Sequence, residues 1–300
     1  MSTPTILGVA VGGAAVGALA FTVFFGRLWR GMGAAVFFAL FVSIFLSNSI
    51  KDSYNASNVQ NFGSAMNDEI LPGISDALFG SGGPTEVSDT TETEPKSQGD
   101  LGTMERLFRE QLRINLVFQK EYETALNAAG FGDLLTPSRF LRDTGGSQTE
   151  KIIREARSTV AQFERRAVEE MEKFKEKVRA LDLQDKNAET SFMNGALKSM
   201  QEAKEFNSKS WTLESDILER GIAMANFLNS NRGKWTADGD QIYFEEDSAV
   251  ETYNQLQSQM MAVVADQEAL LRRRQEQFNS LQEKFKKVLA ESGEVSSSKN

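Results

Sequence analysis

The chain has 300 residues, and none of them is histidine or cysteine. This composition excludes His or Cys zinc sites, thiolate-bound iron–sulfur clusters, His-dependent nucleophile systems and disulfide bonds. Residues 1–50 contain no Asp, Glu or Lys and only two Arg, so the other 250 residues hold 31 basic and 42 acidic residues, a net charge of −11. We expect no nucleic-acid partner, because phosphates attract an excess of Lys and Arg.

The apolar residues 1–50 predict a transmembrane hairpin, with the lipid bilayer as a partner. Residues 5–25 are uncharged and mostly apolar, which is enough to cross a hydrocarbon core of about 30 Å as a helix. A second apolar run, residues 28–50, has a strongly apolar part of marginal length, so a single span is the alternative. A cleaved signal peptide fits poorly, because no basic region precedes the first run and no A-x-A pattern follows the second.

Two features of the hairpin bear on its topology and packing. Arg27 and Arg30 lie between the two apolar runs, and loop cations stay on the cytoplasmic side of a membrane. This places both termini, and the polar part of the chain, outside the cytoplasm. The first run has two G-x-x-x-G spacings, which let helix backbones approach closely; they involve Gly8, Gly12, Gly13 and Gly17. We expect these glycines to pack against the second run.

Residues 51–100 are predicted to be a linker. The helical spacing of Val59, Phe62, Met66 and Ile70 indicates a short amphipathic helix that lies either at the membrane surface or on the following domain. Residues 81–100 are rich in Gly, Pro, Ser, Thr and acidic residues and contain a single Val. Such a segment buries too little apolar area to offset its ordering entropy, so we expect a flexible tether at 81–100.

Residues 101–290 predict an all-α domain, an elongated antiparallel bundle of about four helices. No proline follows Pro137, and Ser147 with Glu150 and Ser248 with Glu251 form capping boxes. The long helices are expected at 102–129, 147–181, 187–231 and 248–290. The second and last of these share heptads with one four-residue step, which favours packing of these two helices along their length. Residues 291–300 are predicted to be a disordered tail.

Two smaller elements are predicted inside this domain. Thr136-Pro137 indicates a one-turn helix that carries Phe140 and Leu141, because Pro suits the first helical position. Asp238-Gly239 lies between short β-prone runs and predicts a β-hairpin at about 234–244. A two-stranded ribbon is marginally stable alone, so we expect this hairpin to lie on the helices.

The candidate contact residues of the domain are Gln267 and Arg274, which lie on the apolar stripe of the last helix. Polar residues there can fix register or oligomeric state, or line a ligand site between helices. The preferred interpretation is a partly exposed end of the stripe, with Arg274 extended to solvent. Carboxylate runs at 169–172 and 245–247 are interpreted as solvated surface. We predict no catalytic, cofactor-binding or metal-binding residues.

One segment carries a resemblance to other proteins. Trp235, Asp238-Gly239, Phe244 and Tyr253-Asn254, with the helices before them, resemble a loosely defined group of uncharacterised bacterial proteins. These look like membrane- or lipid-anchored envelope proteins with a helical bundle and an aromatic-flanked D-G hairpin before the last helix. The resemblance covers residues 100–290. It implies a location in the bacterial envelope and supplies no activity or site residues.

Together these features predict a membrane-anchored binding or scaffolding protein of the bacterial cell envelope without catalytic activity. Its partner would be another protein or a second copy, met through the helical bundle. We expect a multi-pass protein of the inner (cytoplasmic) membrane with a periplasmic helical domain. The alternatives are an extracytoplasmic sensory or ligand-binding bundle that regulates a membrane complex, with Gln267 and Arg274 lining its pocket, and a pore-forming protein. An enzyme is disfavoured.

Overall fold

The structure, a computed structural model, describes residues 54, 56–73, 75, 94–239 and 241–297. Both predicted membrane spans and the residues proposed to orient and pack them lie outside these ranges. Among the helices that are described, none has a stretch both long and apolar enough to cross a membrane.

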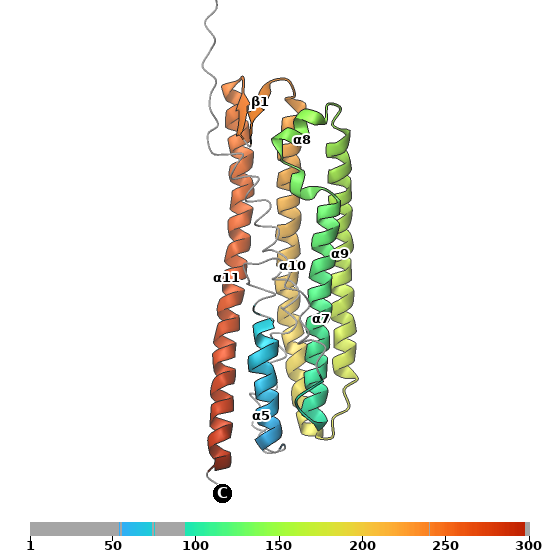
Figure 1. The fold of residues 1–300 in the computed structure, drawn as a ribbon, viewed down its shortest axis with the longest axis vertical. Coiled ribbons are helices and arrows are strands. Elements are labelled where there is room, and N and C mark those ends of the chain that lie inside the picture. The colour runs from blue at the N-terminus through green and yellow to red at the C-terminus, as the bar shows by residue number, and fades with distance from the viewer. Residues whose placement is uncertain (1–53, 55, 74, 76–93, 240, 298–300) are drawn as a thin grey trace, which may run out of the picture. The chain divides into compact units, whose positions relative to one another are not determined.

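The described part of the chain is mostly helical, with a two-stranded hairpin before the last helix, as predicted (Figure 1). The elements are α5 (Ala56–Ala65), the π-helical turn η1 (Met66–Ile70), α7 (Gly99–Ala128), the 3₁₀ turn η3 (Phe131–Asp133), α8 (Pro137–Arg142), α9 (Ser147–Arg179), α10 (Lys186–Ser230), β1 (Trp235–Asp238), β2 (Gln241–Phe244) and α11 (Asp247–Ser297). The disordered tail predicted at 291–300 is wrong as far as Ser297, because α11 continues through this proline-free segment.

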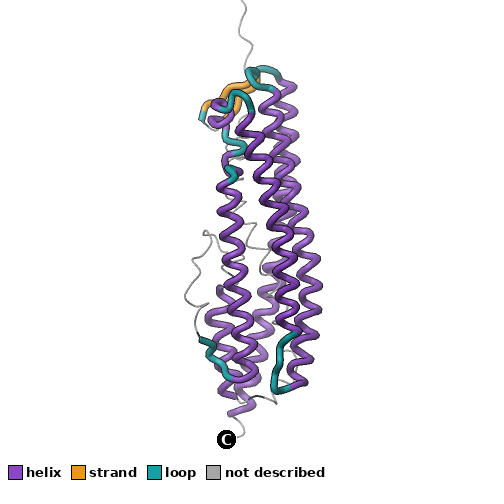
Figure 2. Tube along the Cα trace, turned by 90° about the vertical axis from the view of Figure 1, so that its right-hand side faces the viewer, coloured by secondary structure: helices purple, strands orange, loops and turns teal. Residues whose placement is uncertain are grey.

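The chain divides into two compact units, and each long helix contributes to both. The described residues of unit 1 are 122–164, 211–239 and 241–269. Those of unit 2 are the described residues from Tyr54 to Glu121, with 165–210 and 270–297. Large side chains that form the buried interior of unit 1 include Tyr122, Phe131, Phe140, Phe163, Trp211, Trp235, Phe244 and Tyr253. Figure 2 shows the strands and connecting loops gathered at one end of unit 1.

The hairpin lies on the helices of unit 1, as predicted. Trp235 pairs with Phe244 and Ala237 with Ile242, and Gly239 has a φ of 59°, which suits the tight turn. The Trp235 indole donates a hydrogen bond of 2.9 Å to the Leu228 carbonyl. The Phe244 ring lies 5.4 Å from the ring of Tyr253. Aromatic packing and one buried hydrogen bond therefore hold the ribbon in place.

The one-turn helix predicted at Thr136-Pro137 is present as α8. Its Phe140 is fully buried and packs edge-on against Trp235, at a centroid distance of 6.2 Å. Leu141, predicted to be carried by the same turn, is 52% exposed. A helix of six residues buries one side only, and the buried side holds Arg139 and Phe140.

The helix predicted at residues 59–70 packs into the core of unit 2. Val59, Phe62, Met66 and Ile70 are buried in one cluster with Met104 of α7 and with apolar residues of α9, α10 and α11. The amphipathic helix therefore docks on the other helices of its unit. The residues between Met66 and Ile70 form a π-helical turn, a rare feature that the spacing did not predict.

Two expectations about unit 2 are wrong. The flexible tether expected at 81–100 ends earlier, because Ser97 is buried and hydrogen-bonded and α7 begins at Gly99. The second and last long helices, α9 and α11, are not neighbours here. Figure 1 shows α10 and α7 between them in unit 2. A shared change in heptad spacing sets local supercoil and does not identify the partner helix.

Candidate functional site

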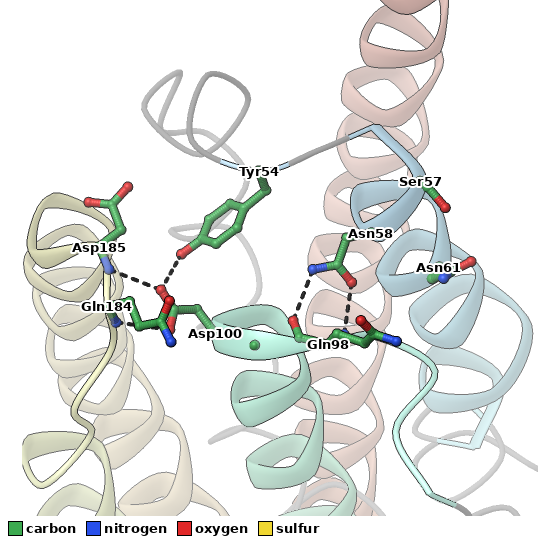
Figure 3. A pocket seen from close by; sticks show the side chains of 9 residues that line it. Tyr54, Ser57, Asn58, Asn61, Gln98, Asp100, Gln184 and Asp185 are labelled. Carbon is green, nitrogen blue, oxygen red and sulfur yellow. Dashed lines mark hydrogen bonds between the residues drawn. The ribbon is translucent and has the colours of Figure 1, made fainter.

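A polar pocket of about 570 Å³ lies in unit 2, where α5, the start of α7 and the connection before α10 meet (Figure 3). Its lining consists of hydroxyl, carboxamide and carboxylate side chains and one glycine: Tyr54, Ser57, Asn58, Asn61, Gln98, Gly99, Asp100, Gln184 and Asp185. Its volume is within the range of small-molecule sites.

Asp100, on the first turn of α7, ties the pocket walls together. One of its carboxylate oxygens accepts hydrogen bonds from the Tyr54 hydroxyl (2.9 Å) and the Asp185 backbone N–H (3.0 Å). The other accepts from the Gln184 backbone N–H at 2.9 Å. The carboxylate is almost fully buried. It therefore joins Tyr54, two residues before α5, to the start of α7 and to the α9–α10 connection.

The Tyr54 hydroxyl is held as a hydrogen-bond donor. Burial raises its pKa above the usual range, and the hydrogen bond and negative charge of Asp100 raise it further. Near neutral pH the phenol stays protonated and continues to donate to Asp100.

Asn58 fixes the opposite wall of the pocket. Its Nδ2 donates to the Gln98 carbonyl at 2.9 Å, and its Oδ1 accepts from the Gln98 backbone N–H at 2.8 Å. The Asn58 amide thus bonds both the N–H and the C=O of Gln98, as a neighbouring strand would in a β-sheet. It joins α5 to the turn that precedes α7 (Figure 3).

An ion-pair network next to the pocket secures the same elements. Arg109 of α7 donates to Glu105 Oε1 (2.8 Å) and to Glu69 Oε2 (2.6 Å) of η1, and Lys96 also pairs with Glu69. Glu105 is fully buried and accepts hydrogen bonds from the backbone N–H groups of Lys96 and Ser97. The network thus clamps η1 and the turn before α7 onto α7.

The electrostatics of this network favour the ionised form of Glu69. Burial of Glu69 raises its pKa, but hydrogen bonds from Lys96 and Arg109, together with their positive charges, outweigh that effect and leave the pKa below its usual range. The groups involved are engaged in holding the unit together. The described residues of the pocket offer a ligand hydrogen-bond donors and acceptors.

The sequence-predicted residues fall elsewhere. Gly8, Gly12, Gly13, Gly17, Arg27 and Arg30 lie outside the described residues. Gln267 belongs to unit 1 and Arg274 to unit 2, and both are buried, so the preferred interpretation of a partly exposed stripe end is wrong. Neither lines the pocket. Within the described ranges, no group of three or more acidic side chains is placed to hold a metal ion.

Arg274 is buried beside an aromatic ring instead of extending to solvent. Its Cζ lies 5.2 Å from the centroid of Phe206, and its Nη1 donates to Gln277 at 3.2 Å. Burial lowers the pKa of the guanidinium to about 10, and the negative charge of Glu202 opposes this shift. The group remains charged near neutral pH, with a cation–π contact as part of its compensation.

Gln267 is 3% exposed, and neither atom of its amide has a hydrogen-bond partner among the described residues. A buried polar group without a partner destabilises a fold by about 1–3 kcal/mol.

We therefore expect Gln267→Met, which keeps the length of the side chain, to raise the free energy of unfolding by about 1–2 kcal/mol. Chemical denaturation would measure it, with Gln255→Met at an exposed position of the same helix as the control. A loss of stability in Gln267→Met would instead reveal a bonding partner for this amide.

Sequence reasoning missed the residues that build the pocket and its network. Periodicity marks apolar residues, and it treats Glu105 and Arg109 as solvated surface. A usable signal was present, because these two opposite charges are four residues apart on the stripe of α7 that holds Leu101, Phe108 and Leu112. No such signal identifies Asn58 or Asp100, whose partners lie in distant segments and are mostly backbone groups.

Comparison of the chain with protein-family models, with curated proteins and with solved structures gave no match.

Proposed function

We propose that the chain is a membrane-anchored binding or scaffolding protein of the bacterial cell envelope, without catalytic activity. Residues 1–50 would form the anchor in the inner membrane, and the helical domain would lie in the periplasm and meet a protein partner or a second copy. The absence of Asp, Glu and Lys from residues 1–50 supports the anchor. Arg27 and Arg30 support the orientation.

The observation that carries this proposal is the docking of α5 and η1. This segment follows the apolar residues directly in sequence, and its Phe62 and Met66 are fully buried in the core of unit 2. Hydrogen bonds of Asn58 and the ion pair of Glu69 add polar links to α7 and the turn before it. An anchor at residues 1–50 would then be joined to a packed helical unit within a few residues, which suits a protein that holds a partner at a membrane.

We infer further that the four long helices form one elongated antiparallel bundle. Their lengths of 30, 33, 45 and 51 residues support this arrangement, as do the short connections between them. Ion pairs between Lys177 and Glu110 in unit 2, and between Arg157 and Glu219 in unit 1, each join antiparallel neighbours.

A ligand-binding bundle is the second candidate function, and the polar pocket beside Asp100 is the observation that favours it. The sequence-based form of this hypothesis used Gln267 and Arg274 as the lining. The pocket of unit 2 is lined by other residues, and these would form the ligand site.

Single-cysteine labelling tests the anchor and its orientation, because the chain has no native cysteine. Cysteines at Leu28, Ser88 and Ser230 would be exposed to a membrane-impermeant maleimide on spheroplasts. We expect labelling at Ser88 and Ser230 and protection at Leu28 until the membrane is dissolved. Ala225→Cys, at a fully buried position near Ser230, is the control for labelling of unfolded protein.

Two results would contradict the proposal. Protection of Ser88 and Ser230 in spheroplasts would place the helical domain in the cytoplasm. Recovery of the protein in the soluble fraction, with all three cysteines reactive, would refute the anchor itself.

A further inference from the structure

The polar groups of the pocket in unit 2 fall into two sets. Asp100, Asp185 and Asn58 are already engaged with the protein backbone. Asp100 accepts from the N–H groups of Gln184 and Asp185, and Asp185 Oδ1 accepts from the N–H groups of Asn187 and Ala188 at the start of α10. These residues shape the pocket.

The second set is available to a ligand. The side chains of Ser57, Asn61, Gln98 and Gln184 are exposed and make none of the hydrogen bonds found among the described residues. They present one hydroxyl and three carboxamides, which both donate and accept hydrogen bonds. Figure 3 shows these side chains around the pocket. Gln98 lies below Asn58, Asn61 lies on α5, and Gln184 lies beside Asp100.

The charged groups that line the pocket disfavour an anion, and their carboxylate oxygens already accept hydrogen bonds from the protein. Among the described residues that line it, none is Lys or Arg, so these residues offer an anionic ligand no counter-charge. The two carboxylates are compensated by backbone N–H groups and, at Asp100, by the Tyr54 hydroxyl, which weakens their attraction for a cation. The remaining interaction is hydrogen bonding to a neutral molecule.

The shape of the pocket adds a second constraint. Tyr54 is partly buried and presents an aromatic ring beside Asp100, which suits the apolar C–H face of a ring-shaped ligand. Gly99 has a φ of 57°, and a Cβ added there would meet nothing within 4 Å. At Gly99 the pocket is therefore lined by backbone alone, which a ligand can approach closely.

We propose that this pocket binds a small, neutral, hydroxyl-rich molecule of the size of a monosaccharide, held by Ser57, Asn61, Gln98 and Gln184 and covered on one side by Tyr54. The inference rests on the ligand-binding function proposed for the pocket and is independent of the membrane anchor.

The test uses the full chain, purified in a detergent without a sugar head group, since such a head group would compete for the site. Saturation-transfer difference NMR would follow glucose and N-acetylglucosamine as neutral probes and putrescine as a cationic probe. The phosphorus line width of inorganic phosphate would report anion binding. The pocket variant is Asn61→Ala with Gln184→Ala, and the matched control is Asn279→Ala with Gln201→Ala, at exposed positions of unit 2 outside the pocket.

We expect saturable binding of at least one sugar, weakened about tenfold in the pocket variant and unchanged in the control, because each lost hydrogen bond contributes about 0.5–1.5 kcal/mol. Absence of saturable sugar binding would overturn the proposal. Tighter binding of putrescine or phosphate would overturn the ligand class, and equal binding by the pocket variant would overturn the location. The labelling pattern of the cysteine variants reports the anchor separately, so the two failures are distinguishable.

Discussion

Replacing Arg109 by alanine is expected to lower the free energy of unfolding by about 3–5 kcal/mol, the range for removing one partner of a buried ion pair. Arg109 is 3% exposed, and its guanidinium contacts Glu105 twice, at 2.8 and 3.0 Å, and Glu69 once, at 2.6 Å. The variant would leave the Glu105 carboxylate fully buried without its counter-charge. Urea denaturation followed by circular dichroism would measure the loss.

Two further variants test whether the loss of stability in Arg109→Ala depends on the burial of Arg109 and on the unpaired charge that the variant leaves. Arg106→Ala removes the same side chain three residues earlier on α7, where it is exposed, and is expected to change stability by less than about 0.5 kcal/mol. Arg109→Met combined with Glu105→Gln removes both charges and is expected to restore much of the stability lost in Arg109→Ala. Equal losses in Arg109→Ala and Arg106→Ala would show that the network contributes nothing specific.

The helices and the hairpin were predictable because local signals determine them. The capping box at Ser147 and Glu150 marks the observed first residue of α9, and Asp238-Gly239 marks the turn between β1 and β2. The spacing of Val59, Phe62, Met66 and Ile70 predicted a helix. It did not determine what covers that helix, because an amphipathic face suits a membrane surface and a protein core equally well.

The pocket was not predictable, because hydrogen bonds between distant segments build it. Tyr54 and Asp100 are 46 residues apart, and Asp100 and Gln184 are 84 apart. A side chain that bonds to backbone groups leaves no pattern in the sequence, since any residue supplies the partner. Gln267 and Arg274 show the converse. Their positions on the apolar stripe of the last helix indicated burial, and both side chains are buried. The prediction of a partly exposed end of that stripe was wrong.

A second buried polar cluster, in unit 1, was missed for the same reason. Arg139 of α8 is 3% exposed and donates to the Leu134 carbonyl at 2.6 Å and to Thr149 Oγ1 at 2.8 Å. Thr149 Oγ1 in turn donates to Asp143 Oδ2 at 2.8 Å, and Arg139 lies 3.5 Å from the same carboxylate. These residues connect η3, α8 and the start of α9, so the path of the chain between two long helices depends on them.

The pKa of Asp143 predicts how acid acts on this cluster. Burial raises the pKa, but hydrogen bonds from the Thr149 backbone and hydroxyl and the Gln148 backbone, together with the charge of Arg139, outweigh it, and the net shift is downward. A carboxyl whose pKa is lower in the folded than in the unfolded state contributes stability above the unfolded pKa, about 4. This contribution is lost as the pH falls through the folded pKa.

Asp143→Asn is therefore expected to lower the free energy of unfolding at pH 7 by about 3 kcal/mol, because it leaves the Arg139 charge buried without its counter-ion. The difference between Asp143→Asn and the parent protein should shrink as the pH falls from about 5 toward 3, because the parent carboxyl becomes protonated as well. Urea denaturation at several pH values would measure both effects.

Asp133→Asn is the matched control. It removes a charge that also acts on Arg139, but from an exposed side chain, so a loss below about 1 kcal/mol is expected. A difference for Asp143→Asn that stays constant with pH would show that the carboxylate charge is not what stabilises this connection.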